Sequence, residues 1–300
     1  MKKNLIEKNL MKVNELSSQI IEKHYFDIFE DEEIIYGRVH SVFNDLINVE
    51  LANKEIIVIA SNRISVKPKM IQVNYFSSSF FKVDDKIVFM KNNCFSNNVK
   101  IVFNQPEIKN CDIRCIWDVN VISESWIYSF YNSLMTLKSE GLLPIIRMNS
   151  TTNNFCNHIM KQLEGLYFNI NQGDIDSLSK IINKLIGVGI GLTPSSDDFL
   201  VGVLLALYLN CQNRNRNELY EAIAKRIQVI CIGKTTKVSE YYIINACRGY
   251  FDLDILCIVE DLKKDSWNFD TFMKVKNHGH SSGIDFLVGF YLSLCKINIM

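Results

Sequence analysis

The stretch that decides the fold of the second half of the chain runs from Gly187 to Leu207 and reads GVGIGLTPSSDDFLVGVLLAL. Its alternating glycines permit positive φ and let a ligand approach the backbone closely. A helix start follows the glycines, where Thr193 is placed to cap, Pro194 suits the first helical position, and acidic residues fill the first turn. Free N–H groups at such a start attract anions. The stretch therefore predicts an apolar helix that begins at a ligand-binding loop.

Two common phosphate-binding motifs do not fit this stretch. In G-x-G-x-x-G the third glycine would fall at Leu192 or Pro194, and the preceding SLSKIINKLI has the period of a helix rather than a strand. A P-loop is also excluded, because the Gly-Lys-Thr at 233–235 has Gln228 where the first glycine is required. The glycines thus belong neither to a dinucleotide fingerprint nor to a P-loop.

A short repeat links this stretch to the end of the chain, since DFLVG at 198–202 recurs at 285–289. On helical spacing, Asp198 and Gly202 share one face, as do Asp285 and Gly289. Small residues on such faces let two helix backbones cross closely. The repeat could be a packing device alone. Acidic residues at a close-packed helix start are costly unless they are used, however, which favours a site.

The overall composition narrows the class of protein. With 300 residues, 48% of them hydrophobic, the chain can bury a core in one or two domains. A formal net charge of zero argues against nucleic acid as a partner. No apolar run reaches membrane-spanning length, and the N-terminus lacks the features of a secretory signal. Nine scattered cysteines without a C-x-x-C indicate reduced thiols. We therefore expect a cytoplasmic protein with no membrane partner and no cysteine-ligated zinc.

The chain in order predicts an α+β protein. Residues 1–29 have a loosely helical pattern, and residues 30–110 hold short β-branched and aromatic segments typical of a small antiparallel β-barrel or sandwich. A linker around 104–119 contains Pro106. Apolar spacing then predicts an all-helical C-terminal domain over 120–300. Its expected helices cover 122–140, 153–168, 174–186, 194–210, 217–232, 236–249, 252–264 and 282–297.

Three segments rich in small polar residues lie beside glycines at predicted helix starts, at 187–198, 233–239 and 278–285. If they converge, they offer backbone donors, hydroxyls, carboxylates and an imidazole, which suit a small substrate with an anionic end and amide-like N–H groups. The candidate catalytic residues are His280, Asp198 and Asp285. The candidate substrate- and anion-binding residues are Gly189, Gly191, Thr193, Ser195, Ser196, Asp197, Thr235, Thr236, Ser239, Ser281, Ser282 and Gly283.

Each of these residues also has an ordinary structural interpretation. Hydroxyl residues at a helix start usually cap it, and Asp197 and Asp198 could simply complement the helix dipole. Alternatively, paired aspartates could hold a hydrated divalent cation. No other metal or cofactor is indicated. The conjunction of three similar segments is what favours a site.

The three motif segments, GVGIGLTPSSDDFLVGVLLAL, TTKVSEYYIINACRGYF and GHSSGIDFLVG, resemble the AllH family. The first family motif, G-x-G-x-G-L-T-P-S-G-D-D, departs from this chain only at Ser196, where the family favours glycine. A side chain there could narrow or repolarise the pocket and so change the substrate. Matches to the first motif are Gly187, Gly189, Gly191, Leu192, Thr193, Pro194, Ser195, Asp197 and Asp198, and matches to the third are Gly279, His280, Ser281, Ser282, Gly283, Asp285 and Gly289.

The resemblance implies a subunit of oxamate carbamoyltransferase that works with two further subunits, AllF and AllG, in anaerobic allantoin and purine nitrogen catabolism. Oxalurate and phosphate would give oxamate and carbamoyl phosphate. A helix start would then bind phosphate, and His280 would protonate the leaving nitrogen. Charge on the carbonyl oxygen would also need stabilisation. Two aspartates beside a phosphate would repel it unless a cation intervenes.

Two other functions stay open from the sequence. The chain could be a non-catalytic ligand-binding or scaffold subunit whose glycine-rich motifs form an interface. It could also be a metal-dependent hydrolase of a ureido or phosphorylated small molecule, acting through Asp197, Asp198 and Asp285. Ligand bound at 187–198 would favour the transferase, whereas activity lost to a chelator and restored by metal would favour the hydrolase.

Overall fold

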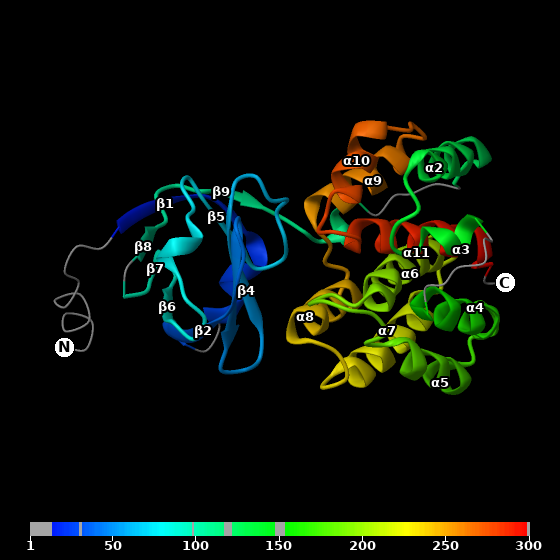
Figure 1. Cartoon of the computed structure of the whole chain (residues 1–300), viewed down its shortest axis with the longest axis horizontal. Helices are drawn as coiled ribbons and strands as arrows, with labels where there is room; N and C mark the ends of the chain where they lie inside the picture. The colour runs from blue at the N-terminus through cyan, green and yellow to red at the C-terminus, as the bar shows by residue number, and fades with distance from the viewer. Residues whose placement is uncertain (1–13, 30–31, 98, 117–121, 148–153, 299–300) are drawn as a thin grey trace. The chain divides into compact units, whose positions relative to one another are not determined.

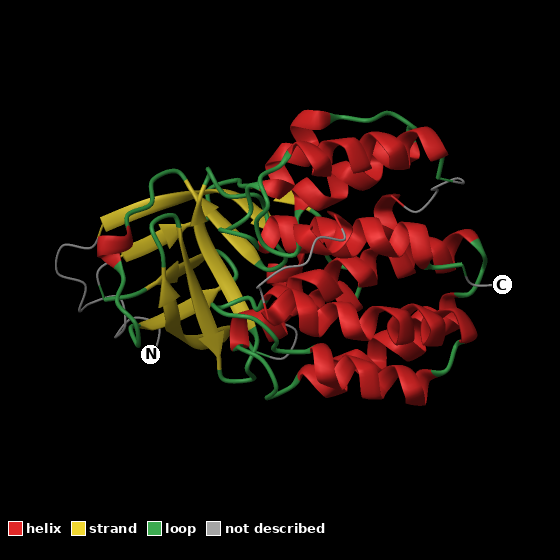
Figure 2. Ribbon diagram, turned by 45° about the vertical axis from the view of Figure 1, so that its right-hand side comes forward, coloured by secondary structure: helices red, strands yellow, loops and turns green. Residues whose placement is uncertain are grey.

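The computed structural model describes residues 14–29, 32–97, 99–116, 122–147 and 154–298 (Figures 1 and 2). The chain divides into two compact units, residues 1–111 and 112–300. The first unit is built of strands and the second of helices (Figure 2). None of the helices in the described ranges is long and apolar enough to cross a membrane.

The first unit is a mixed β-barrel. In the described part, eight strands follow one another in the order β5-β4-β3-β2-β6-β7-β8-β1, and pairing of β1 with β5 closes the ring. The short β9 adds to the far end of β1. The strands are β1 (Asn14–Glu22), β2 (Ile34–Val42), β3 (Leu46–Leu51), β4 (Ile56–Ser61), β5 (Met70–Val73), β6 (Lys86–Met90), β7 (Asn93–Phe95), β8 (Val99–Val102) and β9 (Glu107–Lys109).

The expected barrel is confirmed, but the antiparallel expectation is wrong at three pairings. Strand β1 runs parallel to β8 and β9, and β4 runs parallel to β5. The remaining pairs are antiparallel, and four of these six join consecutive strands as hairpins. The period of a strand in the sequence carries no information about its direction relative to a distant partner. That is why the mixed character was missed.

The helical expectation for the N-terminal segment is wrong over residues 14–22, which form β1. A 3-10 helix, η1 (Lys23–Phe29), follows the strand, while residues 1–13 lie outside the described residues. Leu16 and Ile21 are buried in the barrel core. Pairing with three distant strands therefore outweighs a loosely helical spacing, because strand formation depends strongly on its neighbours.

A buried carboxylate ties the barrel together. Glu22 is fully buried and accepts hydrogen bonds from the backbone N–H groups of His24 (2.9 Å), Lys69 (2.8 Å) and Cys111 (3.1 Å). The Nδ1 atom of His24 lies 2.8 Å from the same carboxylate. Buried polar groups are tolerated when they are bonded in this way. The contact with Cys111 fastens the last residue of the first unit to its first strand.

The second unit is helical, as predicted. Its elements are η3 (Ile113–Ile116), α2 (Glu124–Thr136), α3 (Leu143–Arg147), α4 (Asn154–Gln172), α5 (Ile175–Leu185), α6 (Ser195–Asn213), α7 (Asn217–Cys231), α8 (Lys237–Cys247), α9 (Leu253–Lys263), α10 (Phe269–Lys276) and α11 (Ser282–Lys296). The short helices α3 and α10 were not expected. Ser123 caps α2 by accepting from Trp126 N, and the helix ends at Thr136, before the expected end at 140. Gly141 (φ 54°) lies in the turn before α3.

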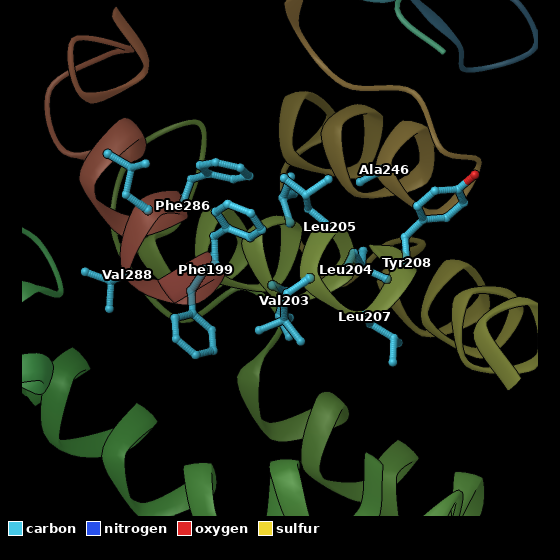
Figure 3. Close-up of a cluster of buried hydrophobic side chains, with 14 of the residues drawn as sticks. Phe199, Val203, Leu204, Leu205, Leu207, Tyr208, Ala246, Phe286 and Val288 are labelled. Atoms are coloured by element: carbon cyan, nitrogen blue, oxygen red, sulfur yellow. The ribbon is translucent and has the colours of Figure 1, made fainter. Parts of the chain in front are cut away.

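Helix α6 is the centre of this unit. Its residues from Phe199 to Leu209 are all buried, so the helix is apolar on every side and must be surrounded. Figure 3 shows Val203 and Leu207 on one side of the helix and Leu205 and Tyr208 on the other. Helices α4, α7, α8 and α11 contact it.

Helices α6 and α11 cross at a backbone-to-backbone contact, which confirms the close crossing predicted from the DFLVG repeat. A Cβ added at Gly202 would lie 2.6 Å from Phe290 N, and one added at Gly289 would lie 2.9 Å from Phe199 C. Real side chains do not approach so closely. Glycine at both positions therefore permits a crossing that brings the two helix starts together.

Candidate functional site

The three glycine-bearing segments converge. Asp197 is the hub that joins the first two, and Thr193 joins the first to the third through Ser282. The Asp197 carboxylate is buried and accepts from Gly187 N at 2.7 Å and from Ser239 Oγ at 2.6 Å. The hydroxyl of Thr235 donates to the same carboxylate. Burial raises the pKa of Asp197, while these donors lower it. The side chain thus joins the glycine loop to the start of α8.

The glycines of this loop serve mainly to close it onto its neighbours. A Cβ at Gly187 (φ 82°) would lie 2.7 Å from Lys234 O, and one at Gly189 (φ 143°) would press on Pro194 and Ser195 N. Thr236, which also caps α8 by accepting from Ser239 N at 3.1 Å, donates to Leu192 O. Only Gly191 (φ 92°) faces open space. Gly191 is therefore the loop glycine that a ligand could approach.

The start of α6 differs from the expectation in its capping. The helix begins at Ser195, Pro194 occupies the N-cap position, and no side chain caps it. Thr193 instead places its Oγ1 2.8 Å from Ser282 Oγ at the start of α11. A contact between helix starts has replaced the local cap that the sequence suggested.

The first-turn N–H groups of α6 are largely occupied by the protein itself. Ser196 N donates to Val188 O at 3.0 Å, and the N–H groups of Asp197 and Asp198 donate to Pro194 O. An anion at this helix start would find few free donors, so the geometry does not support the phosphate site expected there.

Ser196, where the chain departs from the family glycine, is fully buried. Its hydroxyl donates to Leu185 O at 2.6 Å and accepts from Val188 N at 2.9 Å. These bonds hold the end of α5 and the glycine loop to α6. The contacts thus give Ser196 a structural role rather than the expected effect on a substrate pocket.

Asp285, at the start of α11, is fully buried. It accepts from Leu142 N at 2.6 Å and from Ser281 Oγ at 3.1 Å, and Ser195 also donates to it. Burial raises its pKa from 3.8 to about 6, although these donors act in the opposite direction. A Cβ at Gly141 would collide with this carboxylate. Asp285 thus fixes the turn before α3.

Asp198 has the most unusual environment of the three aspartates. The residue is half-buried, yet its Oδ2 atom is sealed from solvent and has no hydrogen-bond partner among the described residues. Burial raises its pKa well above the ordinary value, and the neighbouring charge of Asp285 adds to this. The hydroxyls of Ser282 and Thr193 act in the opposite direction. The environment of Asp198 therefore shifts its carboxyl toward the protonated form.

Two other predicted groups lie apart from this network. His280 is exposed, and no described residue forms a hydrogen bond with it. Its neighbour His278 is the bonded histidine, with Nε2 3.1 Å from Asp254 Oδ2. Gly283 serves packing, because a Cβ there would lie 2.7 Å from Lys276 O on α10. The structure thus groups the aspartates with hydroxyls and leaves the imidazole outside.

Sequence reasoning missed two supporting residues. Glu240 is buried and accepts from Gly233 N at 2.5 Å and from Lys237 Nζ at 2.7 Å, so it holds the turn before α8. Its position in the first turn after Thr236 was the available signal. Leu142, which donates to Asp285 from 143 residues away, carried no signal in the sequence. Within the described ranges, no three His, Cys, Asp or Glu side chains are arranged to hold a metal ion.

Comparison with family models identifies the chain. The model described as oxamate carbamoyltransferase subunit AllH matches residues 185–294, and the AllH family N-terminal domain matches residues 14–108. The chain belongs to the AllH family. All three converging segments fall inside the first match, and the whole barrel except the end of β9 falls inside the second. No solved structure matches this AllH-family chain.

Proposed function

We propose that the chain is a subunit of a carbamoyltransferase that converts oxalurate and phosphate into oxamate and carbamoyl phosphate. The family match supports the transferase class, because its model is described as an oxamate carbamoyltransferase subunit. The convergence of 187–198, 235–239 and 281–285 supports a site at the starts of α6, α8 and α11. We place the protein in the cytoplasm, in allantoin and purine nitrogen catabolism.

One observation carries the assignment of the site, namely the sealed, unpartnered Oδ2 of Asp198. A buried polar atom without a partner is costly and calls for an explanation, and a role in binding or catalysis is one that fits its place at the three helix starts. In the neutral form, the Asp198 carboxyl can donate to a substrate oxygen or nitrogen. Carboxylic acids kept neutral by burial serve as donors in this way.

The reaction needs one proton to move. A phosphate oxygen attacks the terminal carbamoyl carbon of oxalurate, the bond from that carbon to the inner nitrogen breaks, and the nitrogen takes a proton to give oxamate. Phosphate loses a proton in forming carbamoyl phosphate, so the acid that protonates the nitrogen can be restored. We assign that acid to Asp198 and keep the exposed His280 as the competing candidate.

The partner subunits follow from the same geometry. The donors at the start of α6 are mostly occupied, so we propose that phosphate is bound by residues of another subunit. Partners resembling AllF and AllG would then complete the site across an interface. The raised pKa of Asp198 and the hydrogen bonds that Asp197 accepts also lessen the repulsion of phosphate without requiring a cation.

The test is reconstitution with co-purified neighbouring subunits, followed by assay of carbamoyl phosphate from oxalurate and phosphate. Asp198→Asn should reduce kcat at least about 100-fold, the scale of a lost general acid, while the complex still assembles. His280→Gln and the exposed Asp176→Asn should act near the wild-type rate. Full activity of Asp198→Asn, or loss only in His280→Gln, would contradict the assignment.

A scaffold function is the second candidate, because many of the site hydroxyls are bonded within the protein itself. If the chain is a scaffold, Asp198→Asn should lower the activity of the complex only to the extent that the substitution weakens assembly of the subunits. The metal-dependent hydrolase is tested in the same assay, where a chelator should leave the rate unchanged if the transferase proposal is right.

A further inference from the structure

A cavity lies at the opposite end of α6 from the aspartates. It has a volume of about 450 Å³ and is lined by residues from η3 and the facing ends of α6, α7 and α8. Tyr208, which lines the cavity, follows Asp197 by eleven residues, which is about 16 Å of helix at 1.5 Å per residue. The cavity is therefore separate from the site proposed above, and its size is that of a small-molecule pocket.

The floor of this cavity is aromatic and held in place. The hydroxyl of Tyr220 donates to Ala246 O at 2.8 Å. Its ring packs edge-on against Tyr208, with centroids 5.1 Å apart at 84°. The Tyr208 hydroxyl has no hydrogen-bond partner among the described residues, and Figure 3 shows it at the outer end of the ring, away from the α6 axis. The floor thus presents a fixed apolar surface and one open hydroxyl.

One wall carries a positive charge that is already oriented. Arg114 Nε donates to Asp112 Oδ1 at 2.8 Å, and Nη2 donates to Asp112 Oδ2 at 2.7 Å and to Tyr250 Oη at 3.2 Å. Its guanidinium carbon also lies 5.4 Å from the centroid of the Tyr250 ring. The remaining nitrogen, Nη1, has no partner in the described ranges. A guanidinium fixed on one edge can bind an oxyanion with the other, and Arg248 adds a second cation to the lining.

The lining also carries a carboxylate and two amides. Glu221 and Asn217 come from α7, and Gln212 comes from the end of α6. None of these three side chains has a hydrogen-bond partner within the described residues. A simple anion would meet the arginines but also the carboxylate of Glu221, which would repel it. A ligand with N–H groups at its other end would satisfy both charges.

We propose that this cavity binds a small carboxylic acid that carries an N–H-rich group, either an α-amino acid or a ureido acid. The carboxylate lies toward Arg114 Nη1 and Arg248, and the ammonium or ureido end lies toward Glu221 and the amides. The apolar part lies on the Tyr208 and Tyr220 rings. This site is independent of the proposed function, because no residue of the aspartate network takes part in it.

The test is calorimetric titration of the full chain with three matched probes, L-alanine, N-carbamoyl-L-alanine and propionate. At least one of the two nitrogen-bearing acids should bind at least about tenfold more tightly than propionate, a difference equivalent to 1.4 kcal/mol. Which of the two binds tells the amino acid from the ureido acid. Absence of binding by both, or equal affinity for propionate, would overturn the proposal.

Variants locate the binding. Glu221→Gln should remove the higher affinity of the nitrogen-bearing probe relative to propionate. Tyr208→Phe, which keeps the ring but removes the hydroxyl, should weaken the affinity of that probe severalfold. Glu218→Gln is the matched control, because it is also exposed on α7 but does not line the cavity. Asp198→Asn should leave the affinity unchanged, which separates this result from the carbamoyltransferase assay. Equal effects of Glu218→Gln and Glu221→Gln would place the probe elsewhere.

Discussion

At the scale of single residues, Asp197 and Asp198 show how neighbours in sequence acquire different properties. Asp197 accepts hydrogen bonds from donors in two of the three segments, whereas one oxygen of Asp198 is sealed from solvent without a donor. The sequence predicted that both would matter. It could not distinguish the roles, because the donors of Asp197 come from residues 38 and 42 positions further along the chain.

The first prediction concerns Asp197 as a structural acceptor. Asp197→Ala should lower the free energy of unfolding by about 3 kcal/mol or more, because hydrogen bonds to a buried charge contribute about 1.5–3 kcal/mol each. Urea denaturation followed by circular dichroism measures it. Asp176→Ala, at an exposed aspartate of α5, should have little effect. Similar losses in both variants would mean that the hub is not structural.

The second prediction concerns Asp285 and pH. Its folded pKa is raised from 3.8 to about 6, so its contribution to stability is present at low pH and is lost as pH rises through that window. The interval of roughly two pH units, at about 1.4 kcal/mol each, makes the loss about 3 kcal/mol. In Asp285→Asn, the fall in stability between pH 4 and 7 should be smaller by about this amount. If the free energy of unfolding falls equally with pH in the wild type and in Asp285→Asn, this prediction is contradicted.

The third prediction concerns Ser196. From helix propensity alone, Ser196→Gly should cost no more than about 1 kcal/mol. Because its hydroxyl makes two buried hydrogen bonds, we now expect about 2–3 kcal/mol in total. Ser196→Ala separates the hydrogen-bond contribution from the helix-propensity contribution, since it removes the hydroxyl but keeps good helix propensity. A cost near zero for Ser196→Ala would show that the hydroxyl is dispensable.

At the scale of elements, what the sequence could predict depended on whether the deciding contacts were local. The period of apolar residues located α6, and the DFLVG repeat indicated its crossing with α11. The cap of α6 was assigned wrongly, since Thr193 contacts Ser282, 89 residues away. Strand β1 was wrongly predicted to be helical because its pairing partners are also distant in the sequence. Helices α3 and α10 span only 5 and 8 residues, too few for a clear period.

The fourth prediction tests the crossing of α6 and α11. Gly289→Ala and Gly202→Ala should each destabilise the protein by about 3 kcal/mol or more, because overpacking against a backbone outweighs the gain of about 1 kcal/mol in helix propensity. Gly165→Ala in α4 is the control, since its Cβ would meet only the end of the Ile181 side chain at 3.2 Å. The control should stay within about 1 kcal/mol of wild type. Tolerance of alanine at Gly289 would refute the close contact.

At the scale of the whole molecule, two hydrophobic cores are separate, one in the barrel and one around α6. The boundary at Cys111 and Asp112 lies inside the predicted linker. Independent cores predict two unfolding transitions, because cooperativity follows the packed core. The sequence indicated two parts through its change of period, but the pairing that closes the barrel was beyond any local pattern.

The fifth prediction assigns those transitions by calorimetry. Glu22→Ala leaves buried backbone N–H groups without their acceptor and should lower the unfolding temperature of the first unit alone. Gly289→Ala should lower the unfolding temperature of the second unit alone. A single transition moved equally by both variants would show that the chain unfolds as one cooperative body.

The closure of the barrel by β1 has a consequence for synthesis on the ribosome. Ile21 pairs with Ile71 on β5 and Asn14 pairs with Val99 on β8, so β1 waits for partners that follow it by about 50 and about 85 residues. Until those partners emerge, β1 stands as an unpaired edge with apolar side chains, which is the kind of segment that aggregates. Pairings so distant in sequence also form slowly. We therefore expect β1 to need protection from aggregation until β5 and β8 have left the exit tunnel.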